Sequence, residues 1–124
     1  MDDHIRRALA HSAIIDMTTV GRRSGQPRRI EIVYHVFDGR IYISGMPRHQ
    51  RRSWLANLAA DPRMTVHLKG TIQADLPATA RIIDDPEERR SVLERIARVW
   101  NRTDVDEMVR YSPLIEVEIA DRAA

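Results

Sequence analysis

The chain has 124 residues, of which 43% are apolar and 31% are charged, with a formal net charge of +2 and no cysteine. This length and composition predict a single globular domain spanning residues 1–124, and they exclude disulfides, thiolate nucleophiles and Cys-based metal sites. No run reaches the roughly 18 apolar residues of an integral membrane segment, and the N-terminus lacks the apolar core of a secretory signal, so we expect a cytoplasmic protein.

The first third of the chain predicts one short helix and two strands. Residues 3–12 favour a helix, and the apolar residues within 14–20 favour a strand. A turn at residues 21–27 separates this strand from a second one at 28–37, where apolar and polar residues alternate. The apolar face carries Ile30, Ile32, Tyr34 and Val36, and the polar face carries Arg29, Glu31 and His35.

A tight turn at Asp38-Gly39 links the second strand to a third. Both central residues of a type I′ turn need a positive φ, and Asp-Gly is a strong signal for that turn. The strand at 40–44 is therefore expected to pair antiparallel with the strand before it. A loop follows at 45–50 and a helix at 51–60, which Asp61-Pro62 ends because proline disfavours helical geometry in the preceding residue.

Two more strands follow this helix. Residues 64–69 alternate between apolar and polar side chains, which predicts a strand. Gly70 then turns the chain into a strand at 71–83. Pro77 interrupts this segment and indicates an edge position or a bulge, because proline cannot donate to a sheet ladder.

The sequence Asp85-Pro86-Glu87-Glu88 marks the start of a helix. It combines an N-cap aspartate, a proline in the first turn and a glutamate at the position that completes a capping box. Another short helix is expected within 103–111. The final strand, at 113–120, places Ile115, Val117 and Ile119 on one face.

Six short strands, mostly linked by hairpins, predict a mainly β fold with inserted helices. The expected architecture is a six-stranded antiparallel β-barrel that is closed or nearly closed, because a barrel removes exposed sheet edges. A parallel α/β sheet needs a helix between most strands. The hairpins predicted at 20–28 and 38–39 therefore exclude it.

Positive charge is concentrated in one part of the chain. Between Arg22 and Arg52 there are eight arginines against two acidic residues. Arg22, Arg23 and Arg28 lie in or beside the glycine-containing turn at 21–27, so backbone N–H groups and guanidinium forks there can hold an oxyanion. A plain hairpin turn with solvated arginines is the alternative.

A second candidate feature spans residues 44–57, where a strand end, a basic loop and a helix follow one another. Trp54 and Asn57 are three residues apart on that helix, and together with the arginine turn they are expected to line the mouth of the barrel. The sequence has no HExxH, P-loop, Rossmann or triad pattern. Its five histidines lack ligand spacing, so neither a metal site nor a catalytic acid–base group is predicted.

These features together resemble the deazaflavin (F-420)-dependent nitroreductase family, which consists of split β-barrel flavin and deazaflavin oxidoreductases. The likeness runs through residues 18–68 and continues more weakly through 113–119. It rests on Thr18-Thr19-x-Gly-Arg-Arg-Ser-Gly-Gln-Pro-Arg, Tyr34, Asp38-Gly39, Ile43-Ser44 and Trp54-Leu-Ala-Asn57-Leu58-Ala-Ala-Asp-Pro62.

The resemblance implies a split barrel of the FMN-binding type, a homodimer, and coenzyme F-420, an 8-hydroxy-5-deazaflavin with an anionic phosphodiester and glutamate tail. It assigns the three arginines of the turn to the phosphate and tail, the strand-end serine to the region near the ring, and Tyr111 to the substrate pocket. The residues that match cofactor-binding positions are Arg22, Arg23, Ser24, Gln26, Arg28, Ser44, Trp54 and Asn57.

Residues 45–52 depart from the family pattern. The family often has a lysine and paired glycines after the strand-end serine, where this chain has Gly45, Met46 and Pro47. Its proline two residues before the tryptophan is replaced by Arg52. With Arg48 and its basic neighbours, this loop can still bind an anion, but in a different way.

The activity that the resemblance implies is hydride transfer from the reduced deazaflavin to a small organic acceptor such as a nitroaromatic or a quinone. The cofactor carries such chemistry, so the protein needs no acid–base constellation. The alternatives are an FMN-dependent oxidoreductase of the same barrel type, a non-catalytic cofactor-binding barrel and a nucleic-acid binder. Aromatic residues make up only 5% of the chain, so base-stacking platforms are scarce and no nucleic-acid partner is expected.

Overall fold

The computed structural model describes residues 1–120 as six strands and four helices. The strands are β1 (Ala13–Val20), β2 (Pro27–Phe37), β3 (Arg40–Ser44), β4 (Arg63–Lys69), β5 (Gln73–Ile82) and β6 (Leu114–Ile119). The helices are α1 (Asp3–Ala8), α2 (Ser53–Ala60), α3 (Pro86–Val99) and α4 (Val105–Tyr111). Each of these elements falls where a strand or helix was predicted, although α1 is shorter than the expected helix at 3–12 and α2 begins two residues after 51.

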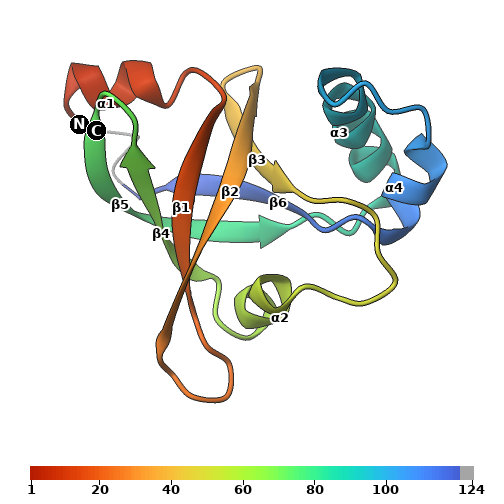
Figure 1. The fold of residues 1–124 in the computed structure, drawn as a ribbon, viewed down its shortest axis with the longest axis horizontal. Coiled ribbons are helices and arrows are strands. Elements are labelled where there is room, and N and C mark those ends of the chain that lie inside the picture. Colours follow the sequence, from red (N-terminus) through yellow and green to blue (C-terminus); the bar gives the residue numbers. More distant parts are fainter. Residues whose placement is uncertain (121–124) are drawn as a thin grey trace.

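The six strands form one closed antiparallel barrel in the order β1-β2-β3-β6-β5-β4. The pairs β1–β2, β2–β3 and β4–β5 are hairpins, β6 lies between β3 and β5, and β1 pairs with β4 to close the barrel. Figure 1 shows α1 beside the beginning of β1, α2 beside its other end, and α3 and α4 together outside the barrel. The predicted mainly β architecture, a six-stranded antiparallel barrel with inserted helices, is confirmed.

Alternate residues of the strands fill the barrel interior. In β1, Ile15, Met17 and Thr19 are buried, whereas the residues between them are partly exposed. Tyr34 of β2 and Val66 of β4 join the same apolar core. The period-two alternation read from the sequence therefore selects the inward face, because successive side chains in a strand point to opposite sides of the sheet.

A second apolar cluster lies where α3 and α4 pack outside the barrel, and it includes Leu93 and Met108. His35 lies against these helices and not in solvent: it is 1% exposed, its ring stacks on Phe37, and Trp100 meets it edge-on with ring centroids 5.4 Å apart. The expected polar face of β2 was therefore wrong at His35. Burial lowers the pKa of its imidazole, and neither ring nitrogen has a hydrogen-bond partner within residues 1–120.

Pro77 does not mark a sheet edge, because β5 pairs with β4 on one side and with β6 on the other. The expected interruption of this strand was wrong as well, since β5 runs continuously through Pro77. The Pro77 carbonyl accepts a hydrogen bond from the Ala120 backbone N–H at the point where β6 ends. In an antiparallel sheet the N–H and C=O of one residue point to the same neighbouring strand. The N–H that Pro77 lacks would therefore point to the end of β6, so no hydrogen bond within the β5–β6 ladder is lost.

Two local turn and cap predictions are confirmed. Asp38 and Gly39 have φ values of 53° and 76°, as a type I′ turn requires. Asp85 caps α3 by accepting the Glu88 backbone N–H at 2.9 Å. The Glu88 carboxylate instead accepts two hydrogen bonds from Arg81, so no reciprocal capping-box bond forms. No helix within residues 1–120 is both long enough and apolar enough to cross a membrane.

Candidate functional site

The arginine-bearing turn between β1 and β2 is fixed by its own backbone and by one serine. Gly21 and Gln26 are bridged by a 2.8 Å backbone hydrogen bond, and the Gly25 N–H donates to the Gly21 carbonyl at 2.8 Å. Ser24 Oγ accepts the Gln26 N–H at 3.1 Å and lies 3.3 Å from Arg28 Nη2. Gly25 has a φ of 71°, a conformation that glycine adopts without a steric penalty. The turn is thus an ordered loop.

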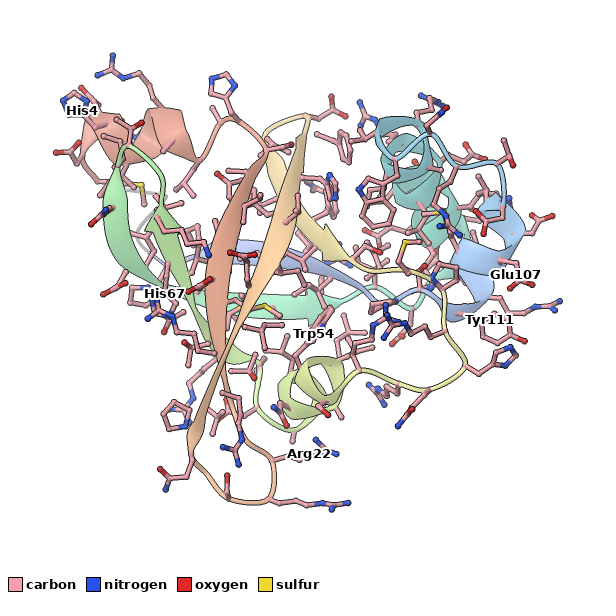
Figure 2. All side chains as sticks on the ribbon, in the orientation of Figure 1. His4, Arg22, Trp54, His67, Glu107 and Tyr111 are labelled. Carbon is pink, nitrogen blue, oxygen red and sulfur yellow. The ribbon has the colours of Figure 1, made fainter. Side chains whose placement is uncertain are left out.

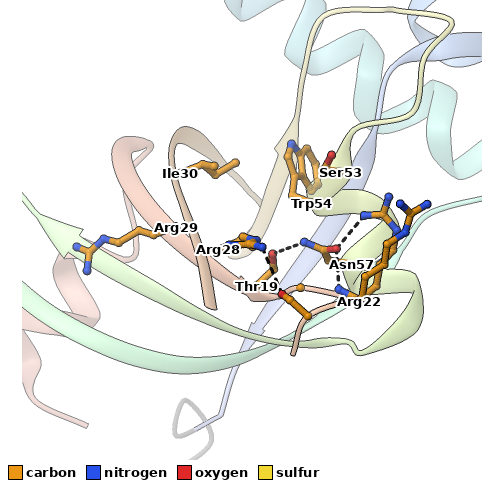
Figure 3. Close-up of a pocket in the computed structure, with 11 residues that line it drawn as sticks. Thr19, Arg22, Arg28, Arg29, Ile30, Ser53, Trp54 and Asn57 are labelled. Carbon is orange, nitrogen blue, oxygen red and sulfur yellow. Dashed lines mark hydrogen bonds between the residues drawn. The ribbon is translucent and has the colours of Figure 1, made fainter. Parts of the chain in front are cut away.

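Helix α2 is joined to this turn by the side chain of Asn57. Its Oδ1 accepts hydrogen bonds from the Arg22 backbone N–H and from Arg22 Nη1, both at 3.1 Å. Its Nδ2 donates to Thr19 Oγ1 at 3.1 Å. Asn57 and Thr19 are 4% and 1% exposed, and Figure 3 shows these three bonds as dashed lines. A single amide therefore sets the position of the loop relative to the helix.

A cavity of about 420 Å³ lies between the turn, the beginning of β2 and α2. One wall carries Trp54 and Ile30, and the other carries polar and charged side chains of the turn. Figure 3 shows Arg29 pointing away from the other labelled side chains, and Arg29 pairs with Asp16 at 3.0 Å. The lining residues are Thr19, Gly21, Arg22, Arg23, Ser24, Arg28, Arg29, Ile30, Ser53, Trp54 and Asn57.

The remaining arginines of this cavity have no acidic partner. Arg22, Arg23 and Arg28 are exposed, and within the described residues none of them forms an ion pair; Arg22 contacts Asn57 and Arg28 contacts Ser24. Three unneutralised guanidinium groups beside an apolar wall favour a ligand that combines an anionic group with a flat or apolar part.

The structure brings together six of the eight residues predicted to bind the cofactor. Arg22, Arg23, Ser24, Arg28, Trp54 and Asn57 line one cavity, as expected for the mouth of the barrel. Gln26 belongs to the same turn but does not line the cavity; its backbone closes the loop.

Ser44 and Tyr111 lie elsewhere. Ser44 is 3% exposed and its hydroxyl donates to the Pro113 carbonyl at 2.6 Å, so it ties the end of β3 to the beginning of β6. Tyr111 is the last residue of α4, and the centroid of its ring lies 4.1 Å from the centroid of the His49 ring. Figure 2 shows Tyr111 on α4, away from Arg22 on the hairpin. Tyr111 lines a second, arginine-rich cavity.

The segment that departs from the family pattern has a packing explanation. An added Cβ at Gly45 would lie 2.9 Å from Arg52 Nη2 and 3.2 Å from Pro113 Cγ. Arg52 therefore occupies the space that a side chain at position 45 would need. The two departures are coupled, and the guanidinium is held beside the strand end.

One hydrogen-bonded chain of side chains was not predicted. Thr18 Oγ1 lies 2.7 Å from His67 Nε2, and His67 Nδ1 lies 2.7 Å from Asp75 Oδ1. Because an ionised carboxylate only accepts, Nδ1 donates to Asp75 and Nε2 accepts the Thr18 hydroxyl proton. A hydroxyl, an imidazole and a carboxylate linked in this order resemble an activated nucleophile. Along β1, β4 and β5, however, these three residues alternate with the core residues that face the barrel interior. None of the three lines the arginine cavity. They come from three strands, and only the strand register places them side by side.

Comparison with known protein families gives a match that covers all six strands of the barrel. The family model described as F420H(2)-dependent quinone reductase matches residues 2–120. The comparison with curated proteins gave no match.

Several solved structures share the fold. A conserved hypothetical protein from Mycobacterium tuberculosis has a TM-score of 0.74 at 22% identity, with 97% of this chain and 81% of that one covered. A structure described as an F420-H2 dependent reductase (FDR-A) has a TM-score of 0.65 at 23% identity, covering 85% and 93% of the two chains. A third, described as a domain-swapped dimer, has a TM-score of 0.65 at 20% identity, covering 94% and 95%.

Proposed function

The chain belongs to the F420H(2)-dependent quinone reductase family and is therefore an F-420-dependent reductase, and from this premise we propose how its residues serve that activity. The proposed reaction is hydride transfer from reduced F-420 to a small organic acceptor, a quinone or a nitroaromatic. The proposed binding site is the cavity between the β1–β2 turn and α2. The observation that carries this assignment is the set of three arginines in that cavity without acidic partners.

The donor set of the cavity fits the anionic part of the cofactor. Arg22, Arg23 and Arg28 would bind the phosphodiester and glutamate tail through charge-assisted hydrogen bonds, each worth about 1.5–3 kcal/mol. The Ser24 hydroxyl adds a polar group beside Arg28. Asn57 would act by positioning Arg22, because its amide oxygen is already shared between two Arg22 donors.

The apolar wall fits the flat part of the same molecule. Trp54 and Ile30 line the cavity opposite the arginines, so they would exclude water from one side of a bound ring. Ser44, which the family resemblance places near the ring, has its hydroxyl engaged by the Pro113 carbonyl. We therefore propose that Ser44 holds the strand end in place and does not donate that proton to a ligand.

Reduced F-420, when bound, supplies the hydride. Orientation and exclusion of water are the protein's contribution, through the fixed loop and the Trp54 wall. Among residues 1–120, no carboxylate or histidine lines the cavity, so we assign protonation of the reduced acceptor to solvent.

Replacing Arg23 with alanine tests the site most cleanly. Arg23 has no hydrogen-bond or ion-pair partner within residues 1–120, so the change removes a charge without breaking a structural contact. We expect at least tenfold weaker binding of oxidised F-420 in a fluorescence titration, with an unchanged melting temperature. Arg29→Ala is the matched control, because Arg29 lies at the same cavity but pairs with Asp16. Equal affinities for wild type and Arg23→Ala would refute the assignment.

Cofactor choice and acceptor choice are separate questions with separate assays. Side-by-side titration of the apo protein with F-420 and FMN tests the FMN-dependent alternative, and we expect tighter binding of F-420. Reduced F-420 is then mixed with a quinone and with a nitroaromatic, and its oxidation is followed by absorbance. Binding of F-420 without oxidation by any acceptor would favour the non-catalytic barrel.

We also propose that the protein is a homodimer. The fold is shared with a structure described as a domain-swapped dimer, and the paired residues Ile14 and Val33 leave 57% and 38% of their surface exposed on the outer face of β1 and β2. Light scattering after size-exclusion chromatography is expected to give twice the mass of the 14.3 kDa chain. Ile14→Lys is expected to shift the protein toward monomer, and a monomeric wild type would contradict the proposal.

A further inference from the structure

A second cavity, of about 390 Å³, lies on the other side of the beginning of α2 from the arginine turn. It is bounded by residues 48–52, by the end of α4 and by the beginning of β6. Five of its lining residues are arginines (Arg48, Arg51, Arg52, Arg89 and Arg110), whereas Asp84 is the one acidic residue among them. Such a concentration of one sign of charge in a concave site raises the local concentration of counter-ions.

Arg89 already has partners and contributes mainly charge. Its guanidinium donates to the backbone carbonyls of Ile83, Val109 and Ser112, the last at 2.7 Å. These bonds tie the end of α4 to Ile83, the residue that follows β5.

Two other donors in this cavity are buried without a partner. Arg52 Nη1 is shielded from solvent and makes no hydrogen bond within residues 1–120, and the same holds for Ser112 Oγ, whose residue is 4% exposed. A buried donor left unpaired is destabilising, because it has lost its hydrogen bonds to water without gaining others. Burial lowers the pKa of Arg52, and the nearby positive charge of Arg48 lowers it further. An acceptor with negative charge would relieve both costs at once.

We propose that this cavity is a second anion site, which binds a carboxylate or phosphate group of a small molecule through the Arg52 guanidinium and the Ser112 hydroxyl, two side chains that line it. Arg48, Arg51 and Arg110 surround the bound group and supply the attractive field. The volume accommodates an organic anion larger than a single oxyanion. The guanidinium lies where a side chain at position 45 would extend, since a Cβ added to Gly45 would be 2.9 Å from Arg52 Nη2.

Inorganic phosphate, titrated at constant ionic strength against the full chain, tests this site without any cofactor. Backbone amide shifts in NMR spectra separate the two cavities: Ser112 reports on this one and Ser24 on the arginine turn. We expect Ser112 to shift saturably at millimolar phosphate. Arg52→Met should weaken that response at least tenfold and leave the Ser24 response unchanged, whereas Arg98→Met, on an exposed arginine of α3, should change neither.

The Arg52→Met spectrum shows directly whether the variant is folded, and Ser112→Ala provides a second test with a several-fold weaker phosphate affinity expected. A Ser112 amide that does not move, or that moves linearly with phosphate and without saturation, would overturn the proposal. So would an Arg52→Met variant with wild-type phosphate affinity.

The bound group can come from the tail of F-420 or from a separate anionic molecule, and a second titration distinguishes them. The protein is saturated with oxidised F-420 and the phosphate titration is repeated. Loss of the phosphate response, with Ser112 already shifted by F-420, identifies the tail as the source. An unchanged phosphate affinity identifies a separate ligand. The first, cofactor-free titration does not depend on the proposed function, so the two proposals can fail independently.

Discussion

Replacing Asn57 with alanine should release the arginine turn from α2 and weaken both the fold and cofactor binding. The change leaves the Thr19 hydroxyl, which is 1% exposed, and the Arg22 backbone N–H without their partner. Two such groups at about 1–2 kcal/mol each reduce the free energy of unfolding by about 3 kcal/mol. For a domain of this size, about 4 °C per kcal/mol gives a fall in melting temperature of about 12 °C. Arg22 also loses its orientation, so F-420 affinity should fall about three- to tenfold.

Thr19→Val is the matched control for this change. It keeps the shape of the side chain and removes only the bond to Asn57 Nδ2, while both bonds to Arg22 remain. We expect a loss of about 1 kcal/mol in the free energy of unfolding and an F-420 affinity within twofold of wild type. Thermal denaturation and fluorescence titration measure the two effects. If Asn57→Ala lowered stability but left the affinity unchanged, Asn57 would support the barrel without positioning the arginine loop.

Three further changes test the loop and two titrating groups. Gly21→Ala places a Cβ 2.8 Å from Ser24 Oγ, so it should distort the loop and weaken F-420 binding several-fold by fluorescence titration; an unchanged affinity would mean that the loop tolerates the shift. Burial depresses the pKa of His35 below 6.5. Below pH 6.5 the unfolded chain therefore binds a proton at His35 more readily than the folded protein does, and the free energy of unfolding of wild type decreases as the pH falls below 6.5. His35→Phe should remove that dependence in urea denaturation at about pH 7.5 and about pH 5, and an equal loss in both proteins would refute it. The hydrogen bonds from Arg63 lower the pKa of Asp61 to about 2 from 3.8. The ionised Asp61 carboxylate therefore stabilises the folded protein above pH 3.8, and this contribution disappears as the pH falls toward 2. Asp61→Asn should therefore be less stable than wild type at neutral pH, with a difference that narrows in acid; a constant difference would contradict the reasoning.

The strands and turns were accessible from the sequence because their signals are local. The alternation at 28–37, the Asp38-Gly39 turn and the Asp85 cap each depend on residues within a few positions of one another. The errors at Pro77 and His35 have the opposite origin. Whether a proline lies at an edge depends on which strands flank β5, and whether a polar-face histidine is exposed depends on where α3 packs.

The candidate site likewise has a part that the sequence predicted and a part that only the tertiary structure shows. The arginines of the turn and the spacing of Trp54 and Asn57 indicated that these residues belong together, and they line one cavity. The sequence did not indicate that the Asn57 amide would be occupied by Arg22 and Thr19, or that Ser44 would face Pro113. Those partners lie 35 to 69 positions apart in the chain.

The sequence by itself determined the barrel and the position of the arginine-bearing turn, because burial of alternate side chains and the φ demands of tight turns act over a few residues. Tertiary structure alone decided which donors are left unpaired. Closure of the barrel pairs β1 with β4 in a register that sets Thr18 opposite Thr65, so Thr18 reaches His67 diagonally, and it brings the 45–52 segment beside the beginning of β6. The unpaired Arg52 and Ser112 donors follow from that closure, since no local pattern records which distant groups share a cavity.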